Sequence, residues 1–347
     1  MGIAVRDGLY NGNILGHMRK LMCPGVHLSG LHSRSEALIG LTRAFDRGQV
    51  GWNEVQERLK LDTMQLLELQ HGLNFDYLSD GALTWQDPMR PLTRSLSGVT
   101  YGARYSRWFD TNTFYQKPIV TQEVGLGEFD VDGFVQKSIS PIIGNWKVSI
   151  PGPFSFSELS ENEFYEDPEE LLRDVARAER QVVDKLVESG VSLVQLSEPC
   201  LVYRPYRKKP FGPEELDSAL SAVKIAANAN ASKVIVHTFF GDPGPVLQEL
   251  LNLPVAGVGV DLYETDLSTI HGNTRGQLVL GIVDSRESHV EEPDWIAKTA
   301  KQVSRRLEAK ELVLAPNTDL RHVPRNIADQ KAQSLAKASK LLTEDWP

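Results

Sequence analysis

Residues 233–242 read Lys-Val-Ile-Val-His-Thr-Phe-Phe-Gly-Asp, and this stretch shows the pattern that decides the fold. Lys233–Val236 contains three β-branched apolar residues in a row, which predicts a short buried strand. The preceding segment, Glu214–Ala229, is expected to be a helix, and polar residues follow the strand. A helix, a buried strand and a polar strand end together are typical of a parallel sheet covered by helices.

The same unit recurs along the chain. Helices are expected over Ser35–Arg47, Trp52–Gly72, Asp167–Ser189 and Glu214–Ala229. Eight strands, each followed by a helix or a helical excursion, predict an α/β protein with a (β/α)8 TIM barrel. A doubly wound open sheet is the alternative, but no glycine-rich phosphate loop follows the first strand. The predicted strands are Val26–His32, Tyr77–Asp80, Lys147–Pro151, Leu193–Leu196, Lys233–Val236, Gly257–Val260, Leu278–Val283 and Leu312–Ala315.

The segment 82–135 breaks this rhythm after the second strand. It holds Pro88, Pro91 and Pro118 together with many aromatic residues. We expect it to be a long excursion over one face of the barrel, and residues 1–347 to form one barrel domain, because barrels with insertions reach this length.

Composition restricts the class of protein. The net charge of −9 argues against a general binder of nucleic acid or anionic membranes. Two cysteines, Cys23 and Cys200, make neither a disulfide framework nor a thiolate cluster. Residues 1–10 lack a secretory apolar stretch, and no run reaches the length of a membrane span. A cytoplasmic protein is expected.

Polar residues at the strand ends are the candidate catalytic groups. Glu198, His237, Asp261 and Asp284 each follow a predicted strand, and in a TIM barrel such positions share one mouth. Side chains of these types serve as general acids or bases. A single histidine is more often a structural residue, so only their joint presence indicates a site.

The run Arg107-Trp108-Phe109-Asp110-Thr111-Asn112 combines turn-forming residues with aromatic ones. By itself it is consistent with a loop that bonds its own backbone and packs on a core. It also resembles the Trp-Phe-Asp-Thr-Asn signature in the N-terminal half of cobalamin-independent methionine synthase.

Further motifs are similar to that family and occur in the same order. Gly152-Pro153-Phe154 resembles its Gly-Pro turn, and Gln195-Leu196-Ser197-Glu198-Pro199 resembles its Gln-Ile-Asp-Glu-Pro strand end. The remaining similar stretches are Phe239–Asp242, Leu253–Val255, Gly259–Leu262, Gly281–Arg286 and Leu320–Pro324.

The positions at which this chain differs from the family indicate which half of the enzyme it resembles. The family's catalytic barrel holds zinc with a histidine, two cysteines and a glutamate. His237 and Asp261 stand at two of these positions, but Phe239 and Thr318 replace the cysteines. Zinc and other metals are therefore not expected here, because soft thiolate ligands are missing. Ser197 and Ala82 replace the carboxylates that would hold the amino group of homocysteine.

The resemblance therefore implies an N-terminal-type barrel made as a separate chain. Such a chain would be a pterin-binding or supporting subunit of a split methionine synthase, inactive alone and active with a separate zinc-bearing barrel. Its co-substrate would be a methylated tetrahydropterin, with no tightly bound cofactor. A stand-alone enzyme with zinc-independent chemistry, or a non-catalytic binding module, is the alternative. The residues expected to bind the ligand are Arg34, Arg107, Asp110, Asn112, Asp284 and Arg286.

Overall fold

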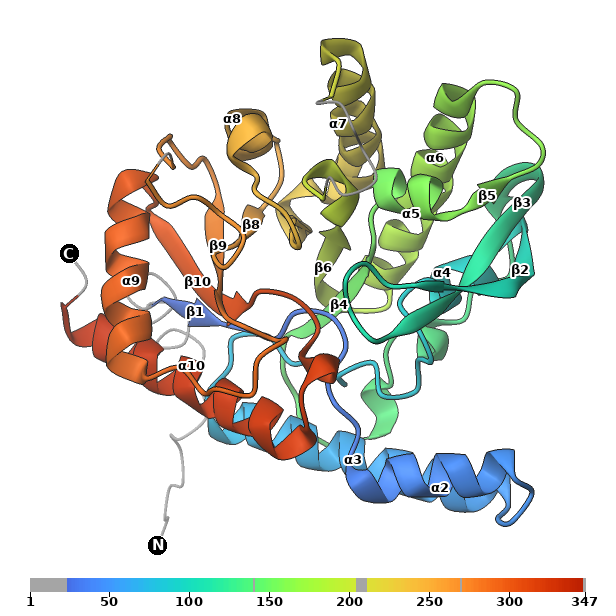
Figure 1. The fold of residues 1–347 in the computed structure, drawn as a ribbon, viewed down its shortest axis with the longest axis horizontal. Coiled ribbons are helices and arrows are strands. Elements are labelled where there is room, and N and C mark those ends of the chain that lie inside the picture. The colour runs from blue at the N-terminus through green and yellow to red at the C-terminus, as the bar shows by residue number, and fades with distance from the viewer. Residues whose placement is uncertain (1–23, 140, 204–210, 269, 346–347) are drawn as a thin grey trace, which may run out of the picture.

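The computed structural model describes residues 24–139, 141–203, 211–268 and 270–345. Its main element is a seven-stranded parallel sheet in the order β1-β10-β9-β8-β7-β6-β4. The sheet is curled, and helices cover its outer side (Figure 1). The strands are β1 (Gly25–Val26), β4 (Trp146–Pro151), β6 (Val191–Ser197), β7 (Val234–His237), β8 (Gly257–Asp261), β9 (Gln277–Val283) and β10 (Glu311–Pro316).

The six strands predicted from residue 147 onward are confirmed to within two residues at each end. Every residue of β7 and β8 is buried. Short runs of β-branched residues suit such strands, since both faces of a covered parallel sheet are shielded from water.

The first two predicted strands are much shorter than expected. β1 covers only Gly25–Val26, and the chain turns away near Gly30, whose φ of +58° favours glycine. Of the predicted strand Tyr77–Asp80, a single bridge between Leu78 and Trp146 remains. This segment nevertheless bonds on both sides, because Asp76 N donates to Val26 O (3.1 Å) and Leu78 N to Asn145 O (2.7 Å).

The four predicted helices are confirmed. Ser35 caps the first of them, since its Oγ accepts from Leu38 N at 3.1 Å. Helices α9 and α10, to which the sequence pattern gave no bounds, pack on one another beside β9 and β10. The helices are α2 (Glu36–Asp46), α3 (Trp52–Gly72), α4 (Arg90–Ser95), α5 (Pro153–Leu159), α6 (Pro168–Glu188), α7 (Pro213–Ala227), α8 (Leu247–Leu251), α9 (Pro293–Arg306) and α10 (Arg325–Asp345).

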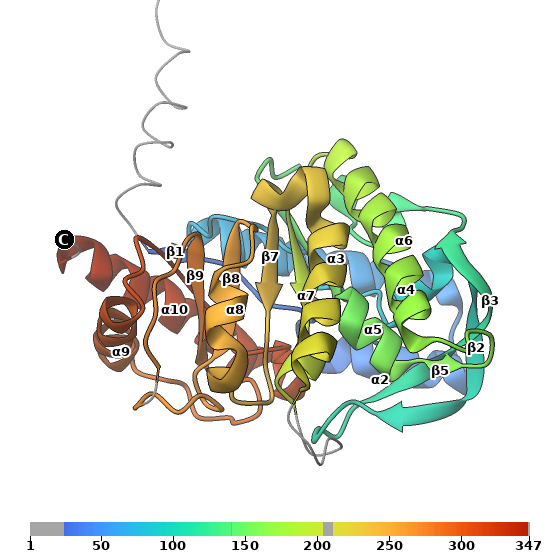
Figure 2. The ribbon, with the colours of Figure 1, turned by 90° about the horizontal axis from the view of Figure 1, so that it is seen from above.

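The excursion after the second strand contains a long antiparallel hairpin. Its strands are β2 (Leu96–Arg107) and β3 (Phe114–Leu126), and β5 (Glu161–Asn162) pairs with β3 in parallel. Pro118 lies at an irregularity of the β2–β3 register, where a missing N–H is tolerated. This small sheet lies at the opposite end of the molecule from α9 (Figures 1 and 2).

The expectations for residues 1–10 and for Cys23 lie outside the described residues. Within the part of the chain that the structure describes, no helix has the length and apolar character needed to cross a bilayer.

Candidate active site at the strand ends

Glu198 follows β6 and holds the start of a neighbouring helix. Its Oε1 accepts from Phe154 N (3.0 Å) and its Oε2 from Ser155 N (2.7 Å), at the first turn of α5. Gly152 makes this approach possible, since a Cβ there would lie 2.4 Å from Glu198 Oε1. Glu198 is completely buried, and burial raises its pKa to about 7 against these hydrogen bonds.

His237 ends β7 and is also completely buried. Its Nδ1 lies 3.4 Å from Ser29 Oγ, while its Nε2 has no hydrogen-bond partner among the described residues. Burial, aided by the nearby Lys147 ammonium, lowers the pKa of His237 to about 3. The ring is therefore neutral at pH 7, and only a backbone hydrogen bond with Asn317 opposes the lowering of its pKa.

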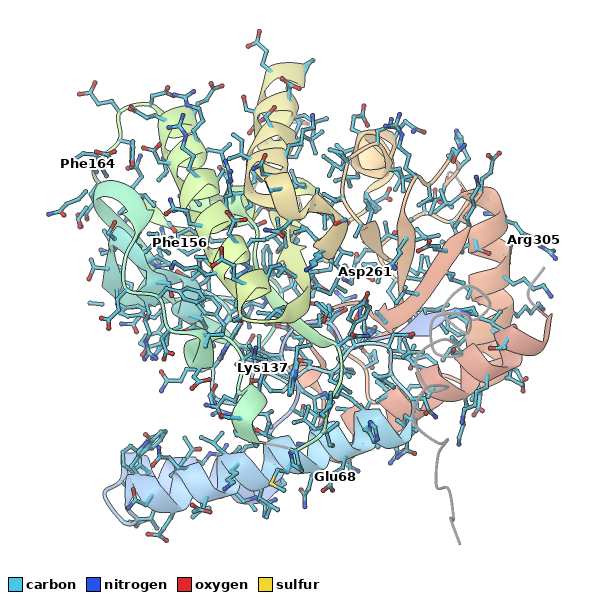
Figure 3. All side chains as sticks on the ribbon, turned by 180° about the vertical axis from the view of Figure 1, so that it is seen from behind. Glu68, Lys137, Phe156, Phe164, Asp261 and Arg305 are labelled. Atoms are coloured by element: carbon cyan, nitrogen blue, oxygen red, sulfur yellow. The ribbon has the colours of Figure 1, made fainter. Side chains whose placement is uncertain are left out.

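Asn317 joins two strand-end carboxylates. Its Nδ2 lies 3.1 Å from Asp261 Oδ1 and 3.3 Å from Asp284 Oδ1. Asp261 also accepts from Phe240 N (3.2 Å) and Tyr263 N (3.0 Å). Burial raises the pKa of Asp261 to about 6, opposed chiefly by the Phe240 hydrogen bond. Asp261 is completely buried, and its label lies near the middle of the view in Figure 3.

Arg286 and Glu291 complete the cluster after β9. The Arg286 guanidinium pairs with Glu264 at 2.8 Å and with Asp284 at 3.4 Å, and it lies over the Phe240 ring. Glu291 Oε1 accepts from Asp284 N at 2.7 Å. Asp284 and Arg286 are thus together, as the sequence suggested, but each is held by protein partners.

The donor set does not suit a zinc ion. Both oxygens of Asp261 already accept hydrogen bonds, and Phe239 brings a ring beside His237, 6.0 Å away between centroids. Thr318 supplies a hydroxyl where a thiolate would be needed. Within the described ranges, no three His, Cys, Asp or Glu side chains gather in a metal-binding group.

The tip of the β2–β3 hairpin reaches these strand ends. Phe109 packs against Tyr203 (4.7 Å between ring centroids) and Phe240 (5.3 Å), which follow β6 and β7. Phe109 and Phe240 both have positive φ, +50° and +65°. Such strained residues gather at functional sites. Trp108 is buried beside Phe109 and Tyr115.

The polar residues of the same tip are exposed. Arg107, Asp110 and Asn112 reach solvent, and Arg107 Nη2 donates to Asn112 Oδ1 at 3.1 Å. Arg34 is half-buried elsewhere on the rim, where it donates to Leu83 O and Trp85 O, both at 2.9 Å. The structure thus divides the expected ligand-binding residues into an exposed tip, Arg34 on the rim, and the pair Asp284 and Arg286 after β9.

The sequence pattern did not indicate two residues of this cluster, Asn317 and Glu291. Asn317 follows a predicted strand, and this position could have marked it as a candidate. Lys147 lies inside the sheet, fully buried, where it donates to Gln195 Oε1 at 2.7 Å and to Leu28 O. A lysine within a predicted strand was a signal of an internal polar contact.

A cavity of about 420 Å³ lies in the excursion. Trp52, Trp85, Arg94, Asp132 and Phe134 are among its lining residues, and none of the candidate catalytic residues is.

Comparison with known proteins finds relatives that are named methionine synthase. It is 25% identical to a methionine synthase from Sulfurisphaera tokodaii over 91% of both chains. It is 24% identical to a methionine synthase from Saccharolobus solfataricus, over 94% of this chain and 97% of the relative.

Solved structures share the fold. A B12-independent methionine synthase from Shewanella sp. W3-18-1, in complex with selenomethionine, superposes with a TM-score of 0.75 at 15% identity, covering 93% of this chain and 98% of that one. A putative vitamin-B12-independent methionine synthase from Listeria monocytogenes gives 0.70 at 17% identity, covering 94% and 99%.

A family model described as the N-terminal domain of cobalamin-independent synthase matches residues 98–308, more than half of the chain. The resemblance in the strand-end and hairpin motifs is thereby confirmed, and the chain belongs to the cobalamin-independent methionine synthase family, matching its N-terminal domain.

Proposed function

We propose that this chain is the pterin-binding or supporting subunit of a split methionine synthase, acting with a separate zinc-bearing barrel. The proposal includes a single cytoplasmic domain whose eight strands close as a (β/α)8 barrel. Its eighth strand would be the segment around Leu78, since this segment bonds to β1 and to the start of β4.

The observation that carries the proposal is that the hairpin tip has a buried aromatic anchor and an exposed set of polar residues. Phe109 anchors the tip on the strand ends, and Arg107, Asp110 and Asn112 remain exposed on it. An anchored loop with an exposed guanidinium suits a ligand that bears carboxylates, because arginine binds them in bidentate fashion. A folding role alone would need the anchor but not the exposed polar set.

The strand ends support a non-catalytic role in methyl transfer to sulfur. A free thiol with a pKa near ~8.5 supplies only a few per cent of thiolate at neutral pH, so transfer to homocysteine needs an activating group. Neutral His237 has no positive charge with which to stabilise the thiolate of homocysteine. Ser197 and Ala82 offer no charge to hold the amino group of homocysteine.

The test is a methyl-transfer assay with homocysteine and several methylated tetrahydropterins. We expect no turnover by this chain alone, and turnover when a zinc-bearing barrel of the same family is added. Direct binding of each pterin to the isolated chain, followed by tryptophan fluorescence, tests the ligand separately. Robust turnover by the isolated, metal-stripped chain would overturn the proposal in favour of a stand-alone enzyme.

A further inference from the structure

The cavity beside α4 is lined by residues from separate segments of the chain. Trp52 begins α3, Arg94 lies on α4, and Glu128, Asp130 and Asp132 lie where the chain leaves β3. Helix α4 packs beside the β2–β3 hairpin (Figure 1). The volume of the cavity is about 420 Å³, which is within the range of sites for small molecules, roughly 300–1,000 Å³.

One part of the cavity wall is aromatic. Trp85 is 6% exposed and meets Phe134 edge-on, with 6.5 Å between ring centroids. The buried Nε1 of Trp85 has no hydrogen-bond partner among the described residues, although buried donors are nearly always satisfied. The indole of Trp52 is 48% exposed and leans on Phe45, at 5.3 Å between centroids. These rings suit the apolar part of a ligand.

Opposite charges lie side by side in the wall without pairing. Gly127 N donates to Ser95 O at 2.7 Å, so Arg94 and Glu128 are each one residue away from this hydrogen bond. In the part of the chain that the structure describes, neither has an oppositely charged partner within 4.0 Å. Arg94 hydrogen-bonds with the Tyr101 hydroxyl, which is a neutral partner. The cavity therefore offers one unpaired guanidinium and, next to it, an unpaired carboxylate.

We propose that this cavity binds an α-amino acid with an apolar side chain. Such a ligand carries a carboxylate for Arg94, an ammonium group for Glu128 and an apolar group for the aromatic wall. Arginine binds carboxylates in bidentate fashion, and aromatic rings also attract ammonium groups. Arg94 disfavours a simple cation, whereas Asp130 and Asp132 add negative charge that disfavours a simple anion.

The site goes beyond the proposed function and does not rest on it. None of the candidate catalytic residues lines the cavity. Methionine, the product of the proposed function, belongs to the ligand class, and thioethers make favourable contacts with aromatic rings. Binding of methionine here would place a product-sensing site away from the strand ends.

Titration calorimetry of the full chain measures the binding of L-phenylalanine and L-methionine. Two truncated probes separate the charges of the ligand, since phenethylamine lacks the carboxylate and 3-phenylpropionate lacks the ammonium group. We expect each truncated probe to bind about tenfold or more weakly than L-phenylalanine. Glycine, which has no side chain for the aromatic wall, should show no detectable binding.

Two substitutions locate the binding in the cavity. Arg94→Gln and Glu128→Gln each remove one charge from the wall, and each should weaken L-phenylalanine binding about tenfold or more. Arg94→Gln should also reduce the preference for L-phenylalanine over phenethylamine, which a purely structural role would leave unchanged. Arg104→Gln and Glu123→Gln are the matched controls, because Arg104 and Glu123 are exposed on β2 and β3 and do not line the cavity. Melting temperatures check that all four variants are folded.

Equal L-phenylalanine affinity of the wild type and both cavity variants would overturn the site, and so would a wild type that binds neither amino acid. Phenethylamine binding as tight as L-phenylalanine would replace the amino acid with an organic cation. Equally tight 3-phenylpropionate binding would replace it with an anion, and either result would overturn the proposal. Every readout is a binding measurement, so the cavity site and the methyl-transfer function can fail separately.

Discussion

Among single residues, Glu198 shows how a strand-end carboxylate can serve the fold. Burial raises its pKa from 4.5 to about 7, so the folded protein retains a proton that the unfolded chain releases. Its contribution to stability is therefore full below about pH 4.5 and falls as the pH rises towards 7. We expect a loss of about 1–3 kcal/mol across this window.

Urea unfolding of the wild type and of Glu198→Gln, at several pH values from 4.5 to 7, measures this loss. Glutamine does not titrate, so the variant should show a flatter pH dependence. It can still accept from one of the two α5 N–H groups and should remain folded. Identical slopes for the two proteins would mean that Glu198 does not titrate in this range.

Glu179 on α6 is a buried carboxylate without a role at the strand ends. It is completely buried, neither oxygen has a partner among the described residues, and burial together with Glu198 raises its pKa. We expect Glu179→Met to stabilise the protein by about 1 kcal/mol or more, because it removes an unsatisfied polar group at similar volume. Calorimetric melting measures the gain.

Glu188→Met is the control for this change, since Glu188 is exposed on the same helix and its replacement should shift stability by at most about 0.5 kcal/mol. A loss of stability in Glu179→Met would show that this carboxyl has a favourable partner, such as a buried water.

Among elements, those with a buried periodic pattern could be predicted and the hairpin could not. The strands β4 and β6 to β10 are mostly apolar because they are covered on both faces, so composition alone reveals them. β2 and β3 mix exposed, half-buried and buried residues without a clear period, and Pro118 lies within β3. These two strands form because they pair with each other, and the sequence of either strand alone does not predict that pairing.

The hairpin tip provides a matched pair of substitutions. Phe109→Ala should destabilise the protein by about 3–5 kcal/mol, because a buried ring between Tyr203 and Phe240 is lost. Arg107→Ala should change stability by at most about 0.5 kcal/mol but weaken pterin binding or activation by the partner barrel. Chemical unfolding of both variants measures the structural role of each residue, and pterin titration measures its contact with the ligand. A marked drop in stability with unchanged binding in Arg107→Ala would make this arginine structural.

For the molecule as a whole, sequence could predict that strand ends share a mouth but not how each side chain is used there. His237, Asp261 and Asp284 were expected together because parallel strands end at one edge. The hydrogen bonds of Asp261 and Asp284 to backbone N–H groups and to Asn317 depend on the loops, whose conformations no periodicity encodes. The contact between Phe109 and Phe240 joins segments more than a hundred residues apart and needed the structure.

The same arrangement leads to a prediction about metal. Zinc would have to displace the N–H donors from Asp261 and bind beside the Phe239 ring, with no thiolate from Thr318. We therefore expect substoichiometric zinc in the purified protein after dialysis, measured by atomic emission. About one retained zinc per chain would contradict this. Cys200, close to Glu198 in sequence, would then be the first ligand to examine, and loss of the metal in Cys200→Ser would identify it.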